Sequence, residues 1–164
     1  MKSIFLTITF FLFISSLYAQ DEDYKNSSLT DKRKNSIYIA QDFILTFSIN
    51  YERLFPISNK TSLGLRGGLG RDGGNKDNTA IVEAIFLYGK SKHFIEVGVG
   101  YQQSNLFEKN GDDNPALAIM GGYRYQGPQG FLIKIYPEFI PDLWPKEDSW
   151  GSMPFLGVAL GYSF

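Results

Sequence analysis

Residues 154–164, the last stretch of the chain, read PFLGVALGYSF. Large apolar or aromatic side chains occupy every second position from Leu156 to Phe164, and Gly, Ala or Ser occupy the positions between them. A period of two is that of a β-strand, because successive side chains point to opposite faces of a sheet. The stretch therefore predicts a strand with one bulky apolar face and one face of small residues.

The same alternation recurs from residue 36 onward, in short runs separated by clusters of Gly, Pro, Asn and Asp. No run has a persuasive helical period, so strands and turns are indicated throughout. The run 79–88 is apolar on both faces, which leaves its register open. We count about eight runs: 36–42, 44–54, 61–71, 79–88, 93–104, 115–126, 131–140 and 154–164.

The orientation of the two faces distinguishes a soluble barrel from a membrane barrel. A soluble barrel buries its bulky apolar face and exposes its polar face. If the Leu, Phe and Tyr residues of all these strands pointed inward, they would overfill a narrow interior. If they point outward, they contact lipid, and the small or charged residues line the lumen. We therefore predict an all-β fold, a closed antiparallel up-and-down transmembrane β-barrel of about eight strands. Closure also satisfies the backbone hydrogen bonds within a membrane.

The connections between the runs alternate in length, as they do in outer-membrane barrels with short periplasmic turns and longer external loops. The first external connection, near residues 41–43, is the short exception. An even strand number places both termini on the periplasmic side. The short connections are 56–60, 89–92 and 127–130, and the long ones are 72–78, 105–114 and 141–153.

The first 19 residues have the three zones of a secretory signal peptide: a positive charge at Lys2, an apolar stretch, and small or polar residues ending at Ala19. The apolar stretch is shorter than the roughly 20 residues that a transmembrane helix needs. We predict cleavage after Ala19, a flexible polar segment at 20–35 and the barrel at 36–164. The predicted location is the outer membrane of a Gram-negative bacterium.

The composition excludes several other kinds of site. The formal net charge is −1 at pH 7, which gives no strong attraction for nucleic acid. The chain has no Cys, so disulfides, zinc–thiolate sites and a lipid anchor on an N-terminal Cys are excluded. Its 164 residues allow one domain. We expect no cofactor, no catalytic residue and no metal ligand.

Three strand-end motifs resemble those of a known group of proteins: Asn50-Tyr51-Glu52-Arg53, Gly121-Gly122-Tyr123-Arg124-Tyr125 and Leu160-Gly161-Tyr162-Ser163-Phe164. They are similar to small, largely uncharacterised bacterial outer-membrane β-barrel proteins of the eight-stranded type, over most of 36–164. The resemblance implies a barrel of about eight strands but no activity and no functional residue. The chain end also resembles the C-terminal strand of Gram-negative outer-membrane proteins, which implies that Tyr162 and Phe164 are the signal for the barrel-assembly machinery.

The alternation places several charged side chains in the lumen. Because unpaired charge is costly in a narrow interior, we expect a network of ion pairs and hydrogen bonds that plugs the barrel. A path for ions or protons is the alternative. Glu83 joins the set if the register of 79–88 allows it. The predicted lumen residues are Glu52, Arg66, Glu96, Arg124, Lys134 and Glu138.

The predicted loops carry two further candidate features. Trp144 and Trp150, in 141–153, belong either to an external aromatic girdle or to an anchor for a partner. Asp112 and Asp113 carry the oxygen ligands that calcium prefers, but their spacing is not that of an EF-hand and such clusters are usual in turns. The opposite, periplasmic girdle is predicted at Tyr51, Tyr88, Tyr125 and Phe164.

The favoured function is a structural or interaction role through the loops 105–114 and 141–153, in a monomer whose partners are outer-membrane lipid, the assembly machinery and an extracellular molecule. A lipid-modifying enzyme resembling lipid A deacylases is the first alternative. Such enzymes use a His–Ser pair, whereas the single histidine, His93, has no serine motif beside it. The second alternative is a soluble periplasmic ligand-binding barrel, which would bury residues such as Phe47, Leu65 and Val99.

Overall fold

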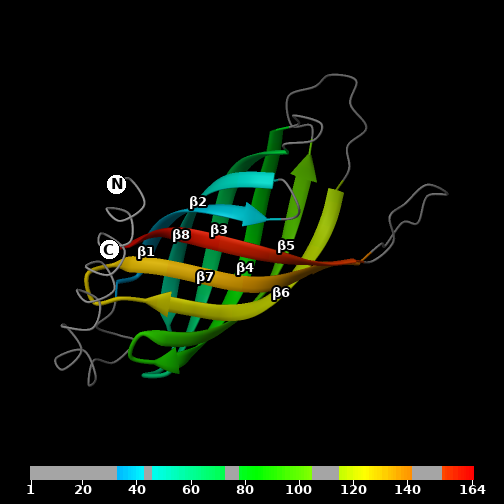
Figure 1. Cartoon of the computed structure of the whole chain (residues 1–164). Helices are drawn as coiled ribbons and strands as arrows, with labels where there is room; N and C mark the ends of the chain where they lie inside the picture. The colour runs from blue at the N-terminus through cyan, green and yellow to red at the C-terminus, as the bar shows by residue number, and fades with distance from the viewer. Residues whose placement is uncertain (1–32, 43–45, 73–77, 105–114, 142–152) are drawn as a thin grey trace, which may run out of the picture.

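The computed structural model describes residues 33–42, 46–72, 78–104, 115–141 and 153–164. These residues form a closed barrel in which each antiparallel strand pairs with its neighbours in the sequence and the last strand pairs with the first (Figure 1). The prediction of an all-β, closed, up-and-down barrel is confirmed. The strands are β1 (Asn35–Asp42), β2 (Thr46–Pro56), β3 (Thr61–Asp72), β4 (Asn78–Lys90), β5 (His93–Ser104), β6 (Pro115–Gln126), β7 (Phe131–Ile140) and β8 (Met153–Ser163).

The observed strand bounds lie within two residues of the predicted ones, and those of β5, β6 and β7 coincide with them. The largest difference is in β2, which continues to Pro56. Phe55 and Pro56 follow the predicted end at Leu54 and pair with Leu63 and Ser62 of β3, so the strand passes the point where the polar turn was expected to begin.

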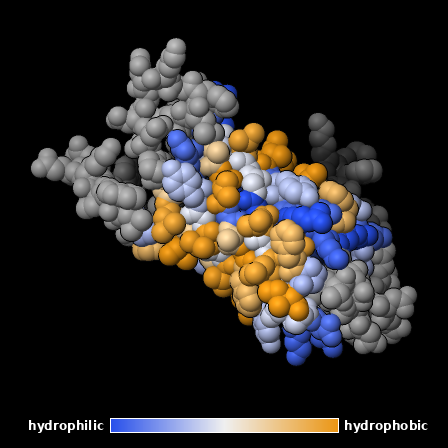
Figure 2. Space-filling view, turned by 180° about the vertical axis from the view of Figure 1, so that it is seen from behind, coloured by the Kyte–Doolittle hydropathy of each residue, from blue (hydrophilic) through white to orange (hydrophobic). Residues whose placement is uncertain are grey.

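Bulky apolar side chains cover the outside of the barrel. Phe47, Leu65 and Val99 are 55%, 55% and 48% exposed. Figure 2 shows apolar side chains over the middle of one face of the molecule, with hydrophilic ones gathered toward its ends. The barrel therefore does not have the orientation that a soluble ligand-binding barrel requires.

One end of the barrel carries the short turns 57–60, 91–92 and 127–130 together with the start of β1 and the end of β8 (Figure 1). Here the Asn35 amide donates to the Phe164 carbonyl at 3.0 Å. Gly130 has a φ of 100°, a conformation that favours glycine, in the β6–β7 turn. We call this the short-turn end, and the opposite end the loop end.

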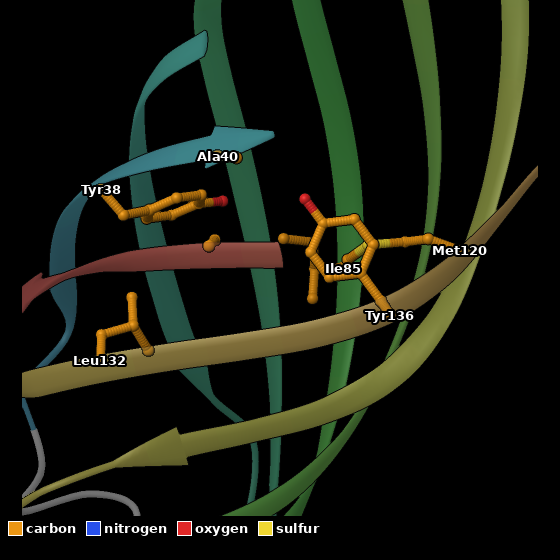
Figure 3. Close-up of a cluster of buried hydrophobic side chains, with 7 residues drawn as sticks. Tyr38, Ala40, Ile85, Met120, Leu132 and Tyr136 are labelled. Atoms are coloured by element: carbon orange, nitrogen blue, oxygen red, sulfur yellow. The ribbon is translucent and has the colours of Figure 1, made fainter. Parts of the chain in front are cut away.

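The lumen is filled by bulky apolar side chains as well as polar ones. The prediction that only small, polar or charged residues line it is therefore incomplete. Leu54, Leu87 and Phe94 form a buried apolar plug from β2, β4 and β5. A second cluster includes Tyr38 and Tyr136, whose rings project from different strands into the interior (Figure 3). Its other members are Ala40, Ile85, Met120, Leu132 and Ala159.

The structure resolves the register of β4. Glu83 points inward with Ile85 and Leu87, while Ala84 and Phe86 point outward. Glu83 is the cross-strand partner of Arg66 on β3, which matches opposite charges inside the lumen. Within the described ranges, no helix has the length and hydropathy needed to cross a membrane.

Candidate functional site in the barrel lumen

Acidic side chains lie together in the lumen. Each of these five carboxylates points inward and is at least 93% buried: Asp42, Glu52, Glu83, Glu96 and Glu138. The strands place three buried cations among them: Arg66, Arg124 and Lys134. Burial of so much charge requires direct pairing, because each ion loses its water. The charges form two clusters.

The first, which we call the Arg124 cluster, consists of Arg124, Lys134, Glu52 and Glu96 from four strands. Arg124 Nη1 contacts a carboxylate oxygen of Glu52 and lies 3.2 Å from Glu96 Oε2. Lys134 Nζ lies 3.0 Å from Glu52 Oε2 and 2.5 Å from Glu96 Oε1. Each carboxylate therefore bridges both cations, and the cluster closes as a ring with two charges of each sign.

Neutral polar groups add further hydrogen bonds to the Arg124 cluster. Arg124 Nη2 donates to Ser36 Oγ and to Gln126 Oε1, each at 3.2 Å. The Tyr38 hydroxyl donates to Glu52 Oε2 at 3.2 Å and accepts from Lys134 Nζ at 3.3 Å. The bonds from Arg124 to Ser36 and from Lys134 to Tyr38 cross the lumen between strands that do not pair, so the cluster ties those strands together.

The second, the Arg66 cluster, consists of Arg66, Asp42, Glu83 and Asn50. Arg66 Nη2 lies 2.7 Å from Asp42 Oδ2 and Nη1 lies 3.0 Å from Glu83 Oε2. Its Nε donates to Asn50 Oδ1 at 2.8 Å. One guanidinium therefore binds two carboxylates and an amide, and each of its three nitrogens donates a hydrogen bond.

Asp42 receives further hydrogen bonds that share its negative charge. Ser48 Oγ donates to Asp42 Oδ2 at 2.7 Å, and the Tyr136 hydroxyl donates to Asp42 Oδ1. The carboxylate is thus bound by an arginine, a serine and a tyrosine from three different strands. Asp42 is the last residue of β1, so these contacts fasten the end of that strand.

The Tyr38 ring lies between the two clusters. Lys134 Nζ is 4.7 Å from the ring centroid, and the Arg66 guanidinium carbon is 5.6 Å from it. Both distances are within the range of cation–π attraction. Tyr38 therefore joins the clusters through its ring as well as through its hydroxyl.

A small polar hollow adjoins the Arg66 cluster. Its lining includes Asp42, Arg66, Glu83 and Glu138, and it leaves about 10 Å³ for the centres of water molecules. That space suits about one water. A hollow of this size is too small for a solute, and it leaves the lumen filled, as expected for an eight-stranded barrel.

Inward-facing glycines make room for the large lumen residues. A Cβ on Gly98 would meet the Glu83 carboxylate, and one on Gly157 would meet the Tyr136 ring. Gly161 is related in the same way to Tyr38. The glycines of the alternation are therefore the steric complement of the polar network.

The structure brings together five of the six predicted lumen residues, Glu52, Arg66, Glu96, Arg124 and Lys134, in the two clusters. Glu138 is buried and lines the hollow, and Glu83 joins Arg66. Sequence reasoning missed Asp42, Tyr38 and Tyr136. Their parity would have revealed them: Tyr38 and Asp42 alternate with Ser36 on β1, and Tyr136 lies between Lys134 and Glu138 on β7.

The enzyme alternative depends on His93, which lies on the outside at the start of β5. Its Nδ1 is 2.6 Å from the Tyr123 hydroxyl, and its ring is tilted against Tyr125 with centroids 5.6 Å apart. The hydrogen bond recorded for this side chain among the described residues thus involves a tyrosine and not a serine. Among those same residues, no group of three or more His, Asp or Glu side chains is arranged to hold a metal ion.

The predicted girdle residues lie on the outer face. Tyr51, Tyr88 and Phe164 are about half exposed, and the Tyr51 hydroxyl donates to Asn35 Oδ1 at 2.8 Å. Tyr162 and Phe164 both point outward at the end of β8. The candidate residues Trp144, Trp150, Asp112 and Asp113 lie outside the described residues.

Comparison with known proteins identifies the fold. No protein-family model matches the sequence, and no curated protein is significantly similar to it. The crystal structure of the N-terminal β-barrel domain of Pseudomonas aeruginosa OprF is similar, with a TM-score of 0.51 and 15% sequence identity, over 80% of this chain and 96% of that chain. At this identity the similarity concerns the fold alone, and it agrees with an eight-stranded closed barrel.

Proposed function

We propose that this chain is an outer-membrane β-barrel protein with a sealed lumen, whose role is structural or depends on interactions of its loop end. The observation that carries the proposal is the inverted distribution of residues: bulky apolar side chains cover the outside, and the described carboxylates lie inside. This arrangement suits hydrocarbon and is unfavourable in water.

The lumen supports a sealed barrel more than a conducting one. The Leu54, Leu87 and Phe94 plug and the two ion clusters occupy the interior, and the hollow beside Arg66 holds about one water. The ions of the two clusters are paired with each other, so these clusters offer no row of unpaired charges to a permeating ion. The polar network then acts to hold the strands in one arrangement.

The remaining parts of the proposal rest on the sequence. Residues 1–19 would direct export and be removed after Ala19, and residues 20–35 would lie on the periplasmic side. Tyr162 and Phe164 would be recognised by the barrel-assembly machinery during insertion. Partners outside the cell would meet the loops 105–114 and 141–153, and the barrel would be a monomer.

The first test is heat-modifiability of the protein recovered from the outer-membrane fraction. A closed barrel in detergent migrates faster before boiling than after it, so we expect two bands that interconvert on heating. Recovery from the periplasm as a soluble protein without this shift would refute the proposal.

A second test probes the outer face directly. Val97 is 49% exposed near the middle of β5. Val97→Arg should lower the free energy of unfolding in vesicles by about 2–4 kcal/mol, because it places a charge against hydrocarbon. Val97→Leu is the matched control and should have little effect. Equal stability of the two variants would mean that this surface faces water.

A further inference from the structure

The exposed charges of the described strands and turns are positive. Among the charged side chains whose exposure the structure describes, five cations are exposed and no carboxylate is. Four of the five lie at the short-turn end: Lys34, Arg53, Lys60 and Lys90. Arg71, at the other end of β3, is the fifth. The outer surface at the short-turn end is therefore basic, although the whole chain carries a formal net charge of −1.

An apolar groove of about 600 Å³ lies on the outer wall over strands β3 to β6. Its middle is Ala84, whose cross-strand neighbours are Leu65 on one side and Val99 on the other. A methyl group between two larger side chains leaves a depression in the wall. Phe55 and Phe86 line the part of the groove that is nearer the short-turn end.

Two of the exposed cations, Lys60 and Lys90, lie beyond the short-turn end of this groove, whereas a third, Arg53, flanks the groove on β2. Arg53 is directly across from Leu65, a groove residue, and precedes Phe55 by two positions on the same face. The Lys60 carbonyl accepts a hydrogen bond from the Gly89 amide at 2.9 Å, which brings the β2–β3 turn beside Lys90. Hydrophilic side chains gather toward the ends of this face in Figure 2.

The described contacts of Arg53 are with neutral groups. Its Nη1 donates to Asn35 Oδ1 at 3.2 Å, and its guanidinium carbon lies 5.8 Å from the centroid of the Phe55 ring. These contacts orient the side chain without neutralising it. Because Leu65 is across from both Arg53 and Ala84, Arg53 lies level with the middle of the groove and roughly 20 Å from Lys90, so it cannot share one phosphate with Lys90.

The dimensions fit one leaflet of a bilayer. Ala84 and Lys90 are six residues apart on β4, which is about 20 Å along a strand. With the usual tilt of transmembrane strands, this corresponds to a depth of about 15 Å, half of a typical hydrocarbon core. A lipid with its headgroup beside Lys90 would thus end its acyl chain near Ala84.

We propose that this surface binds an anionic phospholipid of the leaflet at the short-turn end. Lys60 and Lys90 would bind the headgroup phosphate, and one acyl chain would occupy the groove at Ala84. Charge complementarity favours an anionic headgroup over a zwitterionic one, by roughly fivefold for each cation near the surface. This inference rests on the proposed membrane location.

The experiment uses the barrel reconstituted in vesicles of equal parts phosphatidylglycerol and phosphatidylcholine. Native mass spectrometry then compares the two lipids that remain bound after extraction. We expect several-fold enrichment of phosphatidylglycerol on the unaltered protein. The double variant Lys60→Gln, Lys90→Gln should retain both lipids equally. Enrichment should also fall at high salt, because these cations are exposed.

Two matched variants separate the parts of the site. Lys34→Gln removes a cation from the same end that lies across from Leu54 on β2 and not beside Lys60 and Lys90, and should keep the enrichment. Ala84→Phe fills the groove with an apolar side chain and should reduce the total lipid retained. Loss of enrichment in Lys34→Gln as large as in the double variant would indicate diffuse attraction and overturn the proposal.

Failure of this inference differs from failure of the proposed function. A barrel that folds in vesicles but binds both lipids equally would refute the lipid site and leave the membrane proposal standing. A chain that folds in no lipid would refute the proposed function itself. Residues 20–32 include Asp21, Glu22, Asp23 and Asp31. Enrichment seen only after their deletion would assign the basic surface to this segment and overturn the proposal.

Discussion

The Arg124 cluster and the Arg66 cluster lie in the same lumen but balance their charges differently. In the first, two cations and two carboxylates form a closed ring whose side chains are at most 2% exposed. In the second, one guanidinium serves two carboxylates beside a hollow that also reaches Glu138. The difference indicates that the Arg124 cluster is the more sensitive to loss of a partner, whereas hydration moderates the Arg66 cluster.

The largest effect should follow from removing Arg124. Arg124→Met leaves Glu52 and Glu96 with one cation in a dry interior, so we expect a loss of about 3–5 kcal/mol in the free energy of unfolding. Urea titration of the barrel in neutral-lipid vesicles, followed by the folded band on a gel, measures it. Adding Glu52→Gln to Arg124→Met should restore part of the loss, because it removes one uncompensated charge. A loss below about 1 kcal/mol would contradict the dry, closed ring.

Removing Arg66 should have a smaller effect. Arg66→Met leaves Asp42 and Glu83 without their cation, but the adjoining hollow admits water, so we expect a loss of about 2 kcal/mol. This loss comes from uncompensated negative charge. The difference in the free energy of unfolding between the variant and the unaltered protein should therefore become smaller at low pH, where carboxylates are protonated, and remain at neutral pH. The same titration at pH 5 and pH 8 measures it. An effect as large as that of Arg124→Met would remove the distinction between the clusters.

Steric packing around Glu83 provides the third test. Gly98→Val places a side chain against the Glu83 carboxylate inside the lumen and should lower stability by about 1–2 kcal/mol. Gly67→Val is the matched control on the outer face, where an added Cβ meets no atom within 4 Å. The control should leave stability unchanged or slightly higher. Equal effects of the two substitutions would show that the lumen relaxes around the new side chain.

The smallest effect is expected for the residue that joins the clusters. Tyr38→Phe keeps the ring beside Lys134 and Arg66 but removes the hydroxyl bonded to Glu52, for a loss of about 1 kcal/mol. A double-mutant cycle with Arg66→Met measures how much of the link passes through this hydroxyl. Additive effects in the cycle would mean that Tyr38 joins the clusters by its ring alone.

Most of the barrel was predictable because its alternation is strict. β5 was predicted with its exact bounds, since apolar residues alternate with Glu and Gly from Ile95 to Gln102. The register of β4 was not predictable, because Ile81, Ile85 and Leu87 face inward although they are as apolar as the residues that face outward. Its register depends on the pairing of Glu83 with Arg66, which no local pattern reveals.

The sequence by itself determined the class of fold, the number of strands, the alternation of faces and most of the charges that enter the lumen, because all four follow from a period of two and the spacing of turns. Only the tertiary structure decided which charges meet. Arg124 pairs with Glu52 across 72 residues, and Tyr136 reaches Asp42 across 94. The basic surface below the Ala84 groove also emerges only when distant strands and turns lie side by side. These contacts form because the barrel closes, and the local spacing of residues in the sequence does not predict them.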